Sequence, residues 1–426
     1  MDTLYFELYG GLLTFWNSDF TLSALGLIVF DIPRYFISTI AVAFFSDRSH
    51  QKIARSSHRV SVIIPIFNGA ETIRRCVASL RRQTLPPFEI IVINDGSTDN
   101  THTIALTLRA EGHIDHLIHH GTRCGKSAAV NHGARFAKGD LILVLDDDSQ
   151  LYPTGIEVLA QAFDDPQTAA AGGNLLIGNK DQSFLASMQA LEYLISISMG
   201  RNFLDMIDSI ACVSGAYGMF RRNMFMAFGG LNAGSGEDLE LTLRIRKIGY
   251  RVRFVARALA TIDGINNFKG LFDQRSRWDR DSLTIRLRIF KELSFWHPLE
   301  SLSGTFQRLD YLLFDLFPTL IFPFYMIYVI GELGNDSAYF FLGLAIIMMG
   351  LSLFNVSLIL MLYSPSLSFS DFAAATVFPF YQGVLMKCVR FIAYSNEILF
   401  SASHRDSYVP PRVRKTLYHS QEVIVE

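Results

Sequence analysis

The sequence predicts an α/β domain with a mixed, mainly parallel sheet, joined to membrane-spanning helices. Two observations lead to this fold class. Short apolar runs alternate with amphipathic stretches between residues 60 and 145, which is typical of parallel strands covered by helices on both faces. In addition, 50% of the 426 residues are hydrophobic and only 18% are charged, which is too apolar for an ordinary soluble enzyme.

The predicted strands cover residues 60–65, 89–93 and 141–145, and an amphipathic helix is predicted over 70–83. Asn94 and Asp95 directly follow the second strand, and three aspartates follow the third. In parallel sheets, ligands bind beyond the carboxyl ends of the strands. We therefore expect binding residues at these two strand ends.

The hydropathy pattern divides the chain into four parts. Residues 1–46 form a predicted membrane segment with one span at about 22–45, although charges and a proline interrupt its middle. Residues 47–306 form a domain that ends in interfacial helices, 307–400 a second membrane region, and 401–426 a tail. In that second region, 309–330 and 338–362 are each long enough to cross a bilayer. The stretch 372–399 is predicted to be interfacial or re-entrant, with a third span as the alternative.

Basic residues follow the first predicted span and also lie in the tail, and such residues mark the cytoplasmic side of a membrane protein. They are Arg48, Lys52, Arg55 and Arg59 after the span, and Arg405, Arg412, Arg414 and Lys415 in the tail. We therefore expect a multi-pass protein of the plasma or inner membrane whose central domain faces the cytoplasm. No removed signal peptide is expected, because the N-terminus lacks a basic region and a cleavage site.

The charge balance and the cysteines exclude other classes of protein. The formal net charge is −2, so no basic field suggests nucleic acid as a partner. Cys76, Cys124, Cys212 and Cys388 are scattered without a CxxC pattern. They are expected to be reduced thiols in a cytosolic environment.

Asp146, Asp147 and Asp148 at the end of the third strand predict a metal site. Like charges at this spacing repel each other, unless a hard divalent cation and a diphosphate share the site. Mg²⁺ or Mn²⁺, held by Asp146 and Asp148, would neutralise charge on a leaving diphosphate. The alternative is a capped turn in which Asp148 or Ser149 begins the next helix.

Asp95 and Lys126 are predicted to contact the donor substrate. Asp95 precedes Gly96, which permits a tight turn, and its carboxylate can accept a hydrogen bond from the NH of a uracil ring. An Asx-turn is the structural alternative. Lys126 follows Gly125 without the glycine spacing of a Walker motif, so it is interpreted as a point charge near a diphosphate or as a solvated surface lysine.

Glu237 and Asp238 follow a glycine-rich turn and precede a predicted helix over 239–247. Acids at a helix N-terminus are stabilised by the helix dipole, which gives a structural explanation. The functional interpretation is that Asp238 takes a proton from an acceptor hydroxyl, while Glu237 orients it or contacts the acceptor. Such a single displacement, with a charged leaving group, inverts the anomeric configuration.

Gln274, Arg277 and Trp278 lie within five residues of one another, beside a basic amphipathic stretch. Arg277 can bind a diphosphate with two parallel hydrogen bonds, and Gln274 is assigned to the same group. Trp278 offers a flat face on which a sugar ring can stack. An interfacial helix anchored by arginine and tryptophan is the alternative.

Four histidines, His113, His116, His119 and His120, invite a metal interpretation. Their spacing fits no zinc signature, and they lie in a stretch that reads as loop. They are expected to be surface histidines.

Taken in this order, the motifs resemble those of processive, inverting, membrane-embedded family 2 glycosyltransferases, the group that includes cellulose, chitin and hyaluronan synthases. The segments that carry the resemblance are 61–68, 94–99, Asp146-x-Asp148, 213–221, 228–231, Glu237-Asp238 and Gln274-x-x-Arg277-Trp278. The resemblance implies a GT-A-type sheet domain and a UDP-sugar donor with Asp95 at the uracil. It also implies a DxD metal motif at Asp146 and Asp148 and a growing polysaccharide as acceptor.

Some features depart from that group and leave alternatives open. Asp279, Arg280 and Asp281 follow Trp278, where many relatives have small or uncharged residues. One alternative is an enzyme that adds a single sugar to a polyprenyl or ceramide-type lipid, and another is a non-catalytic partner that binds nucleotide-sugar or polymer. A transporter without chemistry is disfavoured because over half of the chain reads as an α/β domain. The sugar, the linkage, the product length and any accessory subunit are left undetermined.

Overall fold

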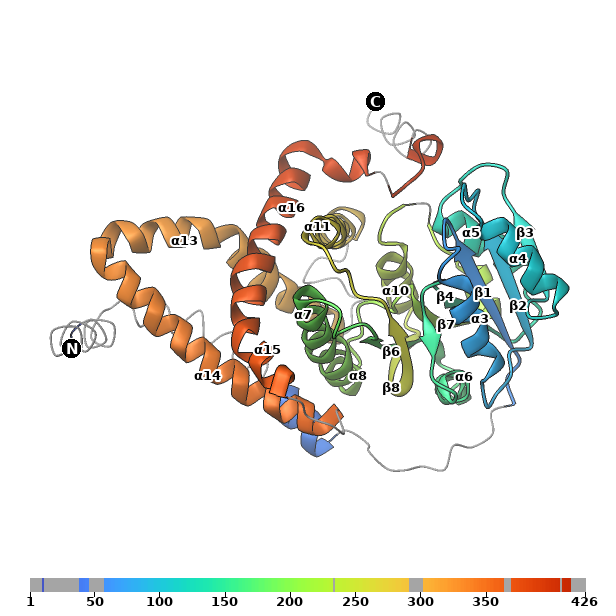
Figure 1. The fold of residues 1–426 in the computed structure, drawn as a ribbon, viewed down its shortest axis with the longest axis horizontal. Coiled ribbons are helices and arrows are strands. Elements are labelled where there is room, and N and C mark those ends of the chain that lie inside the picture. The colour runs from blue at the N-terminus through green and yellow to red at the C-terminus, as the bar shows by residue number, and fades with distance from the viewer. Residues whose placement is uncertain are drawn as a thin grey trace.

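A mixed eight-stranded sheet forms the centre of the protein (Figure 1). The computed structural model describes residues 10, 38–45, 57–232, 234–290, 302–363, 369–406 and 408–414. The sheet order is β3-β2-β1-β4-β7-β6-β8-β5. The strands are β1 (Val60–Ile66), β2 (Glu89–Asn94), β3 (His116–His119), β4 (Leu141–Leu145), β5 (Gln150–Leu151), β6 (Thr168–Ile177), β7 (Tyr217–Arg221) and β8 (Arg251–Ile262).

Strands β3, β2, β1 and β4 are parallel to one another, and β6 is parallel to β8, whereas β7 and β5 pair antiparallel with their neighbours. All residues of β1, β2 and β4 are buried, as expected for apolar strands covered on both faces. The predicted mixed, mainly parallel sheet is therefore confirmed. The predicted strands match β1, β2 and β4 to within one residue.

Helices cover both faces of the sheet, and the predicted helix over 70–83 is present as α3. In this domain the helices are α3 (Ile73–Arg81), α4 (Thr101–Ala110), α5 (Lys126–Phe136), α6 (Gly155–Ala160), α7 (Phe184–Tyr193), α8 (Asn202–Met206), α9 (Arg222–Ala227), α10 (Glu237–Lys247) and α11 (Phe268–Thr284). Short 3₁₀ or π segments follow three of them, namely η1 (Gln161–Asp164), η2 (Leu194–Arg201) and η3 (Ile285–Ile289). Helix α5 packs closely on β1 and β2, because a Cβ on Gly133 would lie 2.7 Å from the Ile93 side chain.

The prediction of surface histidines is confirmed for His113, His116 and His119, but two of these lie in a strand and not in a loop. His116 and His119 are the two ends of edge strand β3, which pairs with β2. His120 follows that strand, and its imidazole is mostly buried. A four-residue strand with histidine at both ends carries too little apolar periodicity to be recognised in the sequence.

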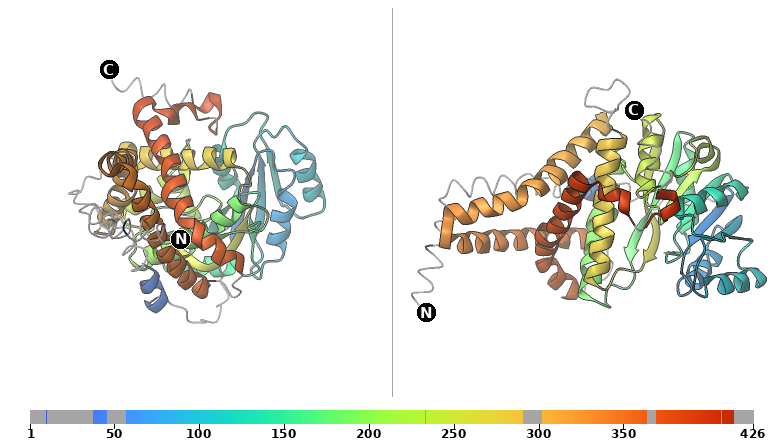
Figure 2. Two further views of the ribbon diagram at one scale, coloured as in Figure 1. Left: turned by 60° about the vertical axis from the view of Figure 1, so that its left-hand side comes forward. Right: turned by 90° about the horizontal axis from the view of Figure 1, so that it is seen from above.

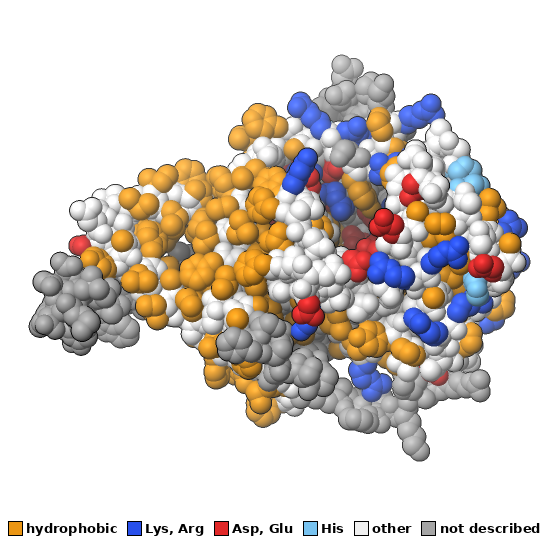
Figure 3. All heavy atoms as spheres, in the orientation of Figure 1, with side chains coloured by type: hydrophobic (Ala, Val, Ile, Leu, Met, Phe, Trp, Pro, Cys, Tyr) orange, Lys and Arg blue, Asp and Glu red, His pale blue; other side chains and the backbone are white. Residues whose placement is uncertain are grey.

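A second group of helices stands beside the sheet domain. It comprises α12 (Leu302–Asp310), η4 (Tyr311–Leu316), α13 (Phe317–Leu333), η5 (Gly334–Asp336), α14 (Ser337–Tyr363), α15 (Phe369–Phe380), η6 (Tyr381–Met386), α16 (Lys387–Phe400) and η7 (Ala402–Arg405). Helices α13 and α14 form a hairpin that extends away from the sheet (Figure 2). In Figure 3 hydrophobic side chains dominate this part of the surface, whereas charged ones gather over the α/β domain.

Two helical stretches in the described part of the chain are long and apolar enough to cross a bilayer, judged by length and composition. The first, 303–362, contains both spans predicted at 309–330 and 338–362, and the second is 372–400. Whether 372–400 spans the membrane or lies at its interface stays a prediction. Of the predicted N-terminal span at about 22–45, only the helical residues 38–45 lie inside the described ranges, and Thr39 there bonds Asn355 of α14 at 3.0 Å.

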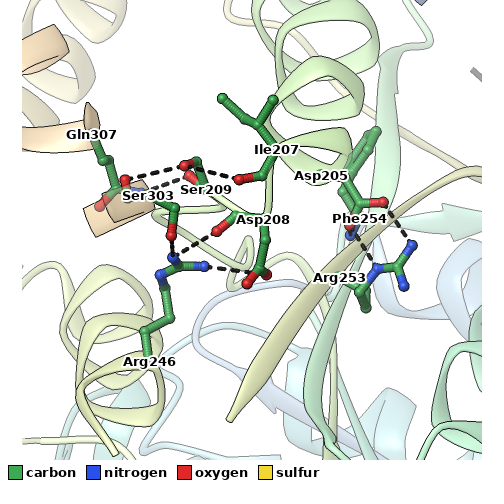
Figure 4. A network of polar contacts seen from close by, with 9 residues as sticks. All are labelled: Asp205, Ile207, Asp208, Ser209, Arg246, Arg253, Phe254, Ser303 and Gln307. Carbon is green, nitrogen blue, oxygen red and sulfur yellow. Dashed lines mark hydrogen bonds and ion pairs between the residues drawn. The ribbon is translucent and has the colours of Figure 1, made fainter. Parts of the chain in front are cut away.

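Arg246 joins the sheet domain to the first helix of the apolar group (Figure 4). From the last turn of α10, its guanidinium donates to the Asp208 carbonyl at 2.7 Å and to Ser303 Oγ of α12 at 2.9 Å. Gln307 of the same helix donates to the Ser209 carbonyl at 2.6 Å. Helix α10 is thus fixed at its C-terminal end to the start of the apolar helices.

Candidate active site

The three aspartates lie at the carboxyl end of β4, where apolar Leu145 gives way to Asp146. Thr72 donates a hydrogen bond to the Asp147 carboxylate, and the backbone of Gly69 packs against the same group. The aspartates are followed by strand β5, not by a helix, so the alternative of a helix cap at Asp148 or Ser149 is wrong.

Burial and crowding change the protonation of these carboxyls. Burial raises the pKa of Asp148 to about 7, and the neighbouring charges of Asp146 and Asp147 add to that effect. The pKa of Asp147 is also raised, first by burial. The protein's own positive groups near this strand end, such as Lys126, therefore do not fully compensate the negative charge of the three aspartates.

Lys126 is the first residue of α5, and its ammonium lies between the aspartates and a backbone turn. Its Nζ is 2.5 Å from Asp146 Oδ1 and donates to the Gly215 carbonyl at 3.3 Å. Burial by itself lowers the pKa of Lys126, but the charge of Asp146, helped by Tyr408 and Glu237, raises it overall. The alternative of a solvated surface lysine is wrong, because the Lys126 side chain is only 15% exposed.

Asp95 follows β2 and organises the loop that leads into α5. Its carboxylate accepts hydrogen bonds from the backbone N–H of Cys124 at 2.8 Å and of Gly125 at 2.7 Å. It also bonds His120 Nδ1 at 2.8 Å, and His120 Nε2 lies 2.9 Å from His132 Nδ1. Asp95 is thus largely engaged within the protein, and its predicted contact with a nucleobase stays a prediction.

Asp95, His120 and Cys124 also form a group with metal-ligand chemistry. In the described part of the chain, it is the one group of three whose possible ligand atoms all lie within 4.8 Å of one another. However, the Asp95 oxygens there accept N–H hydrogen bonds from the loop. We therefore interpret the group as a hydrogen-bonded loop anchor.

Glu237 and Asp238, which we call the base motif after the predicted role of Asp238, lie in the first turn of α10, as expected for acids that favour a helix N-terminus. Asp238 Oδ2 accepts the Gly215 backbone N–H at 3.1 Å. Because Lys126 bonds the carbonyl of the same glycine, Gly215 lies between the base motif and the strand-end aspartates. A Cβ at Gly215 would lie 3.1 Å from Lys126 Nζ and 3.5 Å from Asp238 Oδ2, so a side chain there would crowd the lysine and contact the carboxylate.

The loop before α10 is held by polar contacts from two helices. Arg244 of α10 pairs with Glu240 and donates to the Phe228 carbonyl and, at 3.0 Å, to the Gly230 carbonyl. Asn131 of α5 exchanges hydrogen bonds with the Leu231 backbone at 2.7 and 2.9 Å. These contacts hold residues 228–231 against helices α5 and α10.

Helix α11 presents Gln274, Arg277 and Asp281 at spacings of three and four residues, which places them on one face. Arg277 stacks over the Tyr408 ring at 4.1 Å and lies close enough to Glu237 to lower its pKa. Burial nevertheless raises the pKa of Glu237 to about 7. Arg277 therefore belongs to the same charged cluster as Lys126 and the base motif.

Another face of α11 turns toward the apolar helices. Arg275 lies 4.3 Å from the Trp278 ring centroid and pairs with Glu192 at 2.8 Å, and Glu192 accepts from the Tyr381 hydroxyl at 3.0 Å. Glu192 also lines a cavity of about 340 Å³ between η2, η4 and helices α14 to α16. Trp278 thus lies against Arg275, whose partner Glu192 lines this cavity.

The segment after α16 covers the charged cluster and was missed in the sequence. Tyr408 is half-buried over the Arg277 guanidinium, and its carbonyl accepts a hydrogen bond from Arg123 at 3.1 Å. Pro410 packs on Gly125, and Asp406 pairs with Arg280 at 3.0 Å. Nothing in the composition of this tail signals such a role, because its partners lie more than 120 residues away in sequence.

In sum, the structure brings Lys126, Asp146, Glu237, Asp238 and Arg277 into one charged cluster at the carboxyl ends of the strands. Figure 3 shows acidic and basic side chains gathered around a hollow between the sheet domain and the apolar helices. Asp95 is connected to this cluster by the loop 120–125, because it bonds the backbone of Cys124 and Gly125 directly before Lys126. Gln274 accepts a hydrogen bond from Arg275 at 3.3 Å, and Trp278 lies against the Arg275 guanidinium.

The family model described as Glycosyl transferase family 2 matches residues 61–229, which include Asp95, Lys126 and the strand-end aspartates. The chain carries a family 2 glycosyltransferase domain. The matched segment ends before Glu237, so the base motif and the 274–278 motif lie beyond it.

Curated relatives of this chain are named as sugar transferases or polysaccharide synthases. An N-acetylglucosaminyltransferase of Azorhizobium caulinodans is 30% identical over 252 residues, 55% of this chain and 63% of the relative. A poly-beta-1,6-N-acetyl-D-glucosamine synthase of Staphylococcus epidermidis is 25% identical over 264 residues, 60% of this chain and 64% of that one. The matched part thus spans less than two thirds of each relative.

Among solved structures, a mannosyltransferase of Pyrobaculum calidifontis, described in complex with GDP-Man and Mn²⁺, has a similar fold. The TM-score is 0.55 at 17% identity, and the match covers 88% of this chain and 98% of that one. This likeness supports the GT-A-like fold of the sheet domain.

Proposed function

We propose that this protein is a membrane-integrated, inverting glycosyltransferase that transfers a sugar from a UDP-sugar to a growing polysaccharide. The observation that carries the proposal is the cluster in which Lys126 bridges Asp146 and the Gly215 turn that binds Asp238. In this cluster the candidate diphosphate site at Lys126 and the candidate base Asp238 are connected through the single residue Gly215. The names of the relatives favour an N-acetylglucosamine donor.

Asp146 and Asp148 are the residues that would hold a divalent cation. Their carboxylates are the hard oxygen ligands that Mg²⁺ and Mn²⁺ prefer, and the crowded negative charge at this strand end would be relieved by a cation. The metal would supply Lewis-acid stabilisation of the leaving diphosphate. The Mn²⁺ described for the mannosyltransferase agrees with this assignment.

The protein's own groups divide the remaining work. Lys126 and Arg277 place positive charge where the diphosphate would lie, and Gln274 is assigned to the same group. Asp238 would remove the proton from the acceptor hydroxyl as that oxygen attacks the anomeric carbon from the face opposite the diphosphate. Because the diphosphate leaves as an anion, no general acid is needed, and a single displacement inverts the configuration.

The acceptor is assigned to the side of Trp278. Its ring is 40% exposed, and the Arg275–Glu192 pair leads from it to the cavity among the apolar helices. Polar side chains of Asn355, Gln382 and Arg390 line this cavity together with apolar ones. A saccharide chain that grows at Trp278 would enter this cavity on its way out of the cytoplasm.

The test uses the purified full-length chain in nanodiscs with Mn²⁺ or Mg²⁺. UDP-N-acetylglucosamine, UDP-glucose, UDP-glucuronate and UDP-galactose would be offered singly and in pairs, with UDP release and product mass recorded together. We expect UDP release from UDP-N-acetylglucosamine and a ladder or high-mass product. One sugar on a lipid would instead identify a lipid glycosyltransferase, and no release with any donor would contradict catalysis.

A further inference from the structure

The charged residues Asp279, Arg280 and Asp281, which distinguish this chain directly after Trp278, contact three different parts of the protein. Asp279 pairs with Arg390 of α16 at 3.2 Å, and Arg280 pairs with Asp406 of the C-terminal segment. Asp281 alone of the three contacts the loop that precedes the base motif. The proposed function does not account for this contact.

The contact fixes the residues immediately before Glu237. Ser235 Oγ donates to Asp281 Oδ2 at 2.6 Å, and Asp281 is only 6% exposed. The next residue, Gly236, has φ +75° and lies flat against α11, because a Cβ there would be 2.9 Å from Asp281 Cβ and 2.6 Å from Ile285 Cδ1. Asp281 therefore holds the loop through one hydrogen bond and through direct packing.

Helix α10 depends on this contact for its starting direction. Its N-cap is Gly236, which has no side chain to bond the free N–H groups of the first turn. The carbonyl of Gly236 accepts the Glu240 N–H at 3.0 Å, so the position of Gly236 sets the first turn that carries Asp238. A shift of this turn would move Asp238 relative to Gly215 and Lys126.

Three charged groups and one hydroxyl, from four parts of the chain, interact with the Asp281 carboxyl. Arg277 lies on its own helix, Glu237 on α10 and Asp406 on the C-terminal segment, while Ser235 faces it from the loop. Burial raises the pKa of Asp281 to about 7, opposed by the Ser235 hydrogen bond and the charge of Arg277. Asp281 and Glu237 thus share one guanidinium, and the charge of each affects the other.

We propose that Asp281 is a positioning residue for glycosyl transfer, which holds Ser235 and Gly236 so that Asp238 stays in register with Gly215 and Lys126. This inference rests on the proposed function. It assigns a role to a residue that lies outside the Gln274-x-x-Arg277-Trp278 motif.

Three variants separate the hydrogen bond from the charge. Ser235→Ala removes only the hydrogen bond, Asp281→Asn keeps an acceptor oxygen without the charge, and Asp281→Ala removes both. We expect Ser235→Ala and Asp281→Ala to lower kcat about tenfold to a hundredfold with little change in the donor KM, because a displaced base misaligns the reacting groups. Asp281→Asn should retain most of the wild-type kcat at pH 8. In this variant the loss of activity toward acidic pH should occur at a lower pH than in the wild type, because loss of a neighbouring negative charge favours ionised Glu237.

Asp279→Asn is the matched control, since it makes the same change two residues away on the same helix but faces Arg390. It should leave both kcat and the pH profile unchanged. Equal pH shifts in the two asparagine variants, or a wild-type kcat in Ser235→Ala, would overturn the proposal. UDP release by the wild type and its loss in Asp238→Asn would support the proposed function. Either of the two contradicting results would then count only against the positioning role of Asp281.

Hydrogen exchange tests the same contact without relying on activity. Amides of residues 235–241 should exchange several-fold faster in Asp281→Ala and Ser235→Ala than in the wild type, whereas Asp279→Asn should match the wild type. Unchanged exchange in both loop variants would contradict the proposed positioning, whatever donor the enzyme uses.

Discussion

The two faces of helix α11 differ in what they contact. Arg277 stacks on Tyr408 of the C-terminal segment and Asp281 bonds the loop before the base motif, whereas Arg275 pairs with Glu192 and lies over the Trp278 ring. On the first face, positive charge lies beside buried carboxyls. On the second, an arginine is neutralised by glutamate and stacked on an indole. We propose that Arg277 serves the donor and Trp278 the acceptor, so that one short motif would contact both.

The largest effect is expected for Asp238 of α10, the candidate base. Asp238→Asn should lower UDP release by about a thousandfold, because the variant keeps the shape of the side chain but cannot take a proton. UDP binding, measured by calorimetry with Mn²⁺, should remain close to that of the wild type. An Asp238→Asn enzyme with full turnover would show that the base lies elsewhere.

The site features that could be predicted from the sequence differ from those that could not in how far apart the residues involved lie along the chain. The strand ends at Asp95 and Asp146 could be located because apolar runs of about five residues stop abruptly at acids. The first turn of α10 could be located because Gly236 permits a left-handed residue before two acids. Both signals are local in sequence.

The contacts that complete the cluster are not local. Tyr408 reaches Arg123 across 285 residues, and His120 reaches Asp95 only because β3 pairs with β2. Arg275 and Arg277 differ by two residues, and only their positions around the helix decide which faces Glu192 and which Tyr408. Tertiary packing determines these partners, so composition and spacing could not predict them.

A dependence on pH should follow from the donor-side cluster. The raised pKa of Glu237, about 7, means that this carboxyl is largely protonated below pH 7 and ionised above it. If its charge supports Asp238, kcat/KM should rise as the pH increases through about 7. Glu237→Gln should have a lower rate, by about a hundredfold, and a profile without this limb. A wild-type limb near pH 4 to 5 would contradict a buried, titrating Glu237.

Gly215 tests how closely the base and the lysine approach each other. Gly215→Ala should lower kcat about tenfold to a hundredfold, because the new methyl group would displace Lys126 Nζ, which it would approach to 3.1 Å, beside the Asp238 carboxylate. Its thermal midpoint should change little. The control is Gly331→Ala, since a Cβ at Gly331 would meet no atom within 4 Å, and activity equal in the two variants would argue against the close approach.

The smallest effect on activity is expected for the ion pair between α11 and α16. Asp279→Asn removes a buried charged partner of Arg390, which keeps Asp315 at 2.6 Å. The free energy of unfolding should fall by about 2 kcal/mol, seen as a lower thermal midpoint in detergent, with kcat unchanged. A loss of activity without a loss of stability would place Asp279 on the catalytic side of the helix.

The most direct test of the division between the two faces is the ratio of sugar incorporated to UDP released. Arg277→Lys and Trp278→Leu would be compared in nanodiscs with Mn²⁺ and UDP-N-acetylglucosamine. We predict that Arg277→Lys lowers incorporation and UDP release together, because donor binding fails before either can occur. Trp278→Leu should keep much of the UDP release, as hydrolysis, but lose incorporation. The same ratio in both variants would contradict separate donor and acceptor faces on α11.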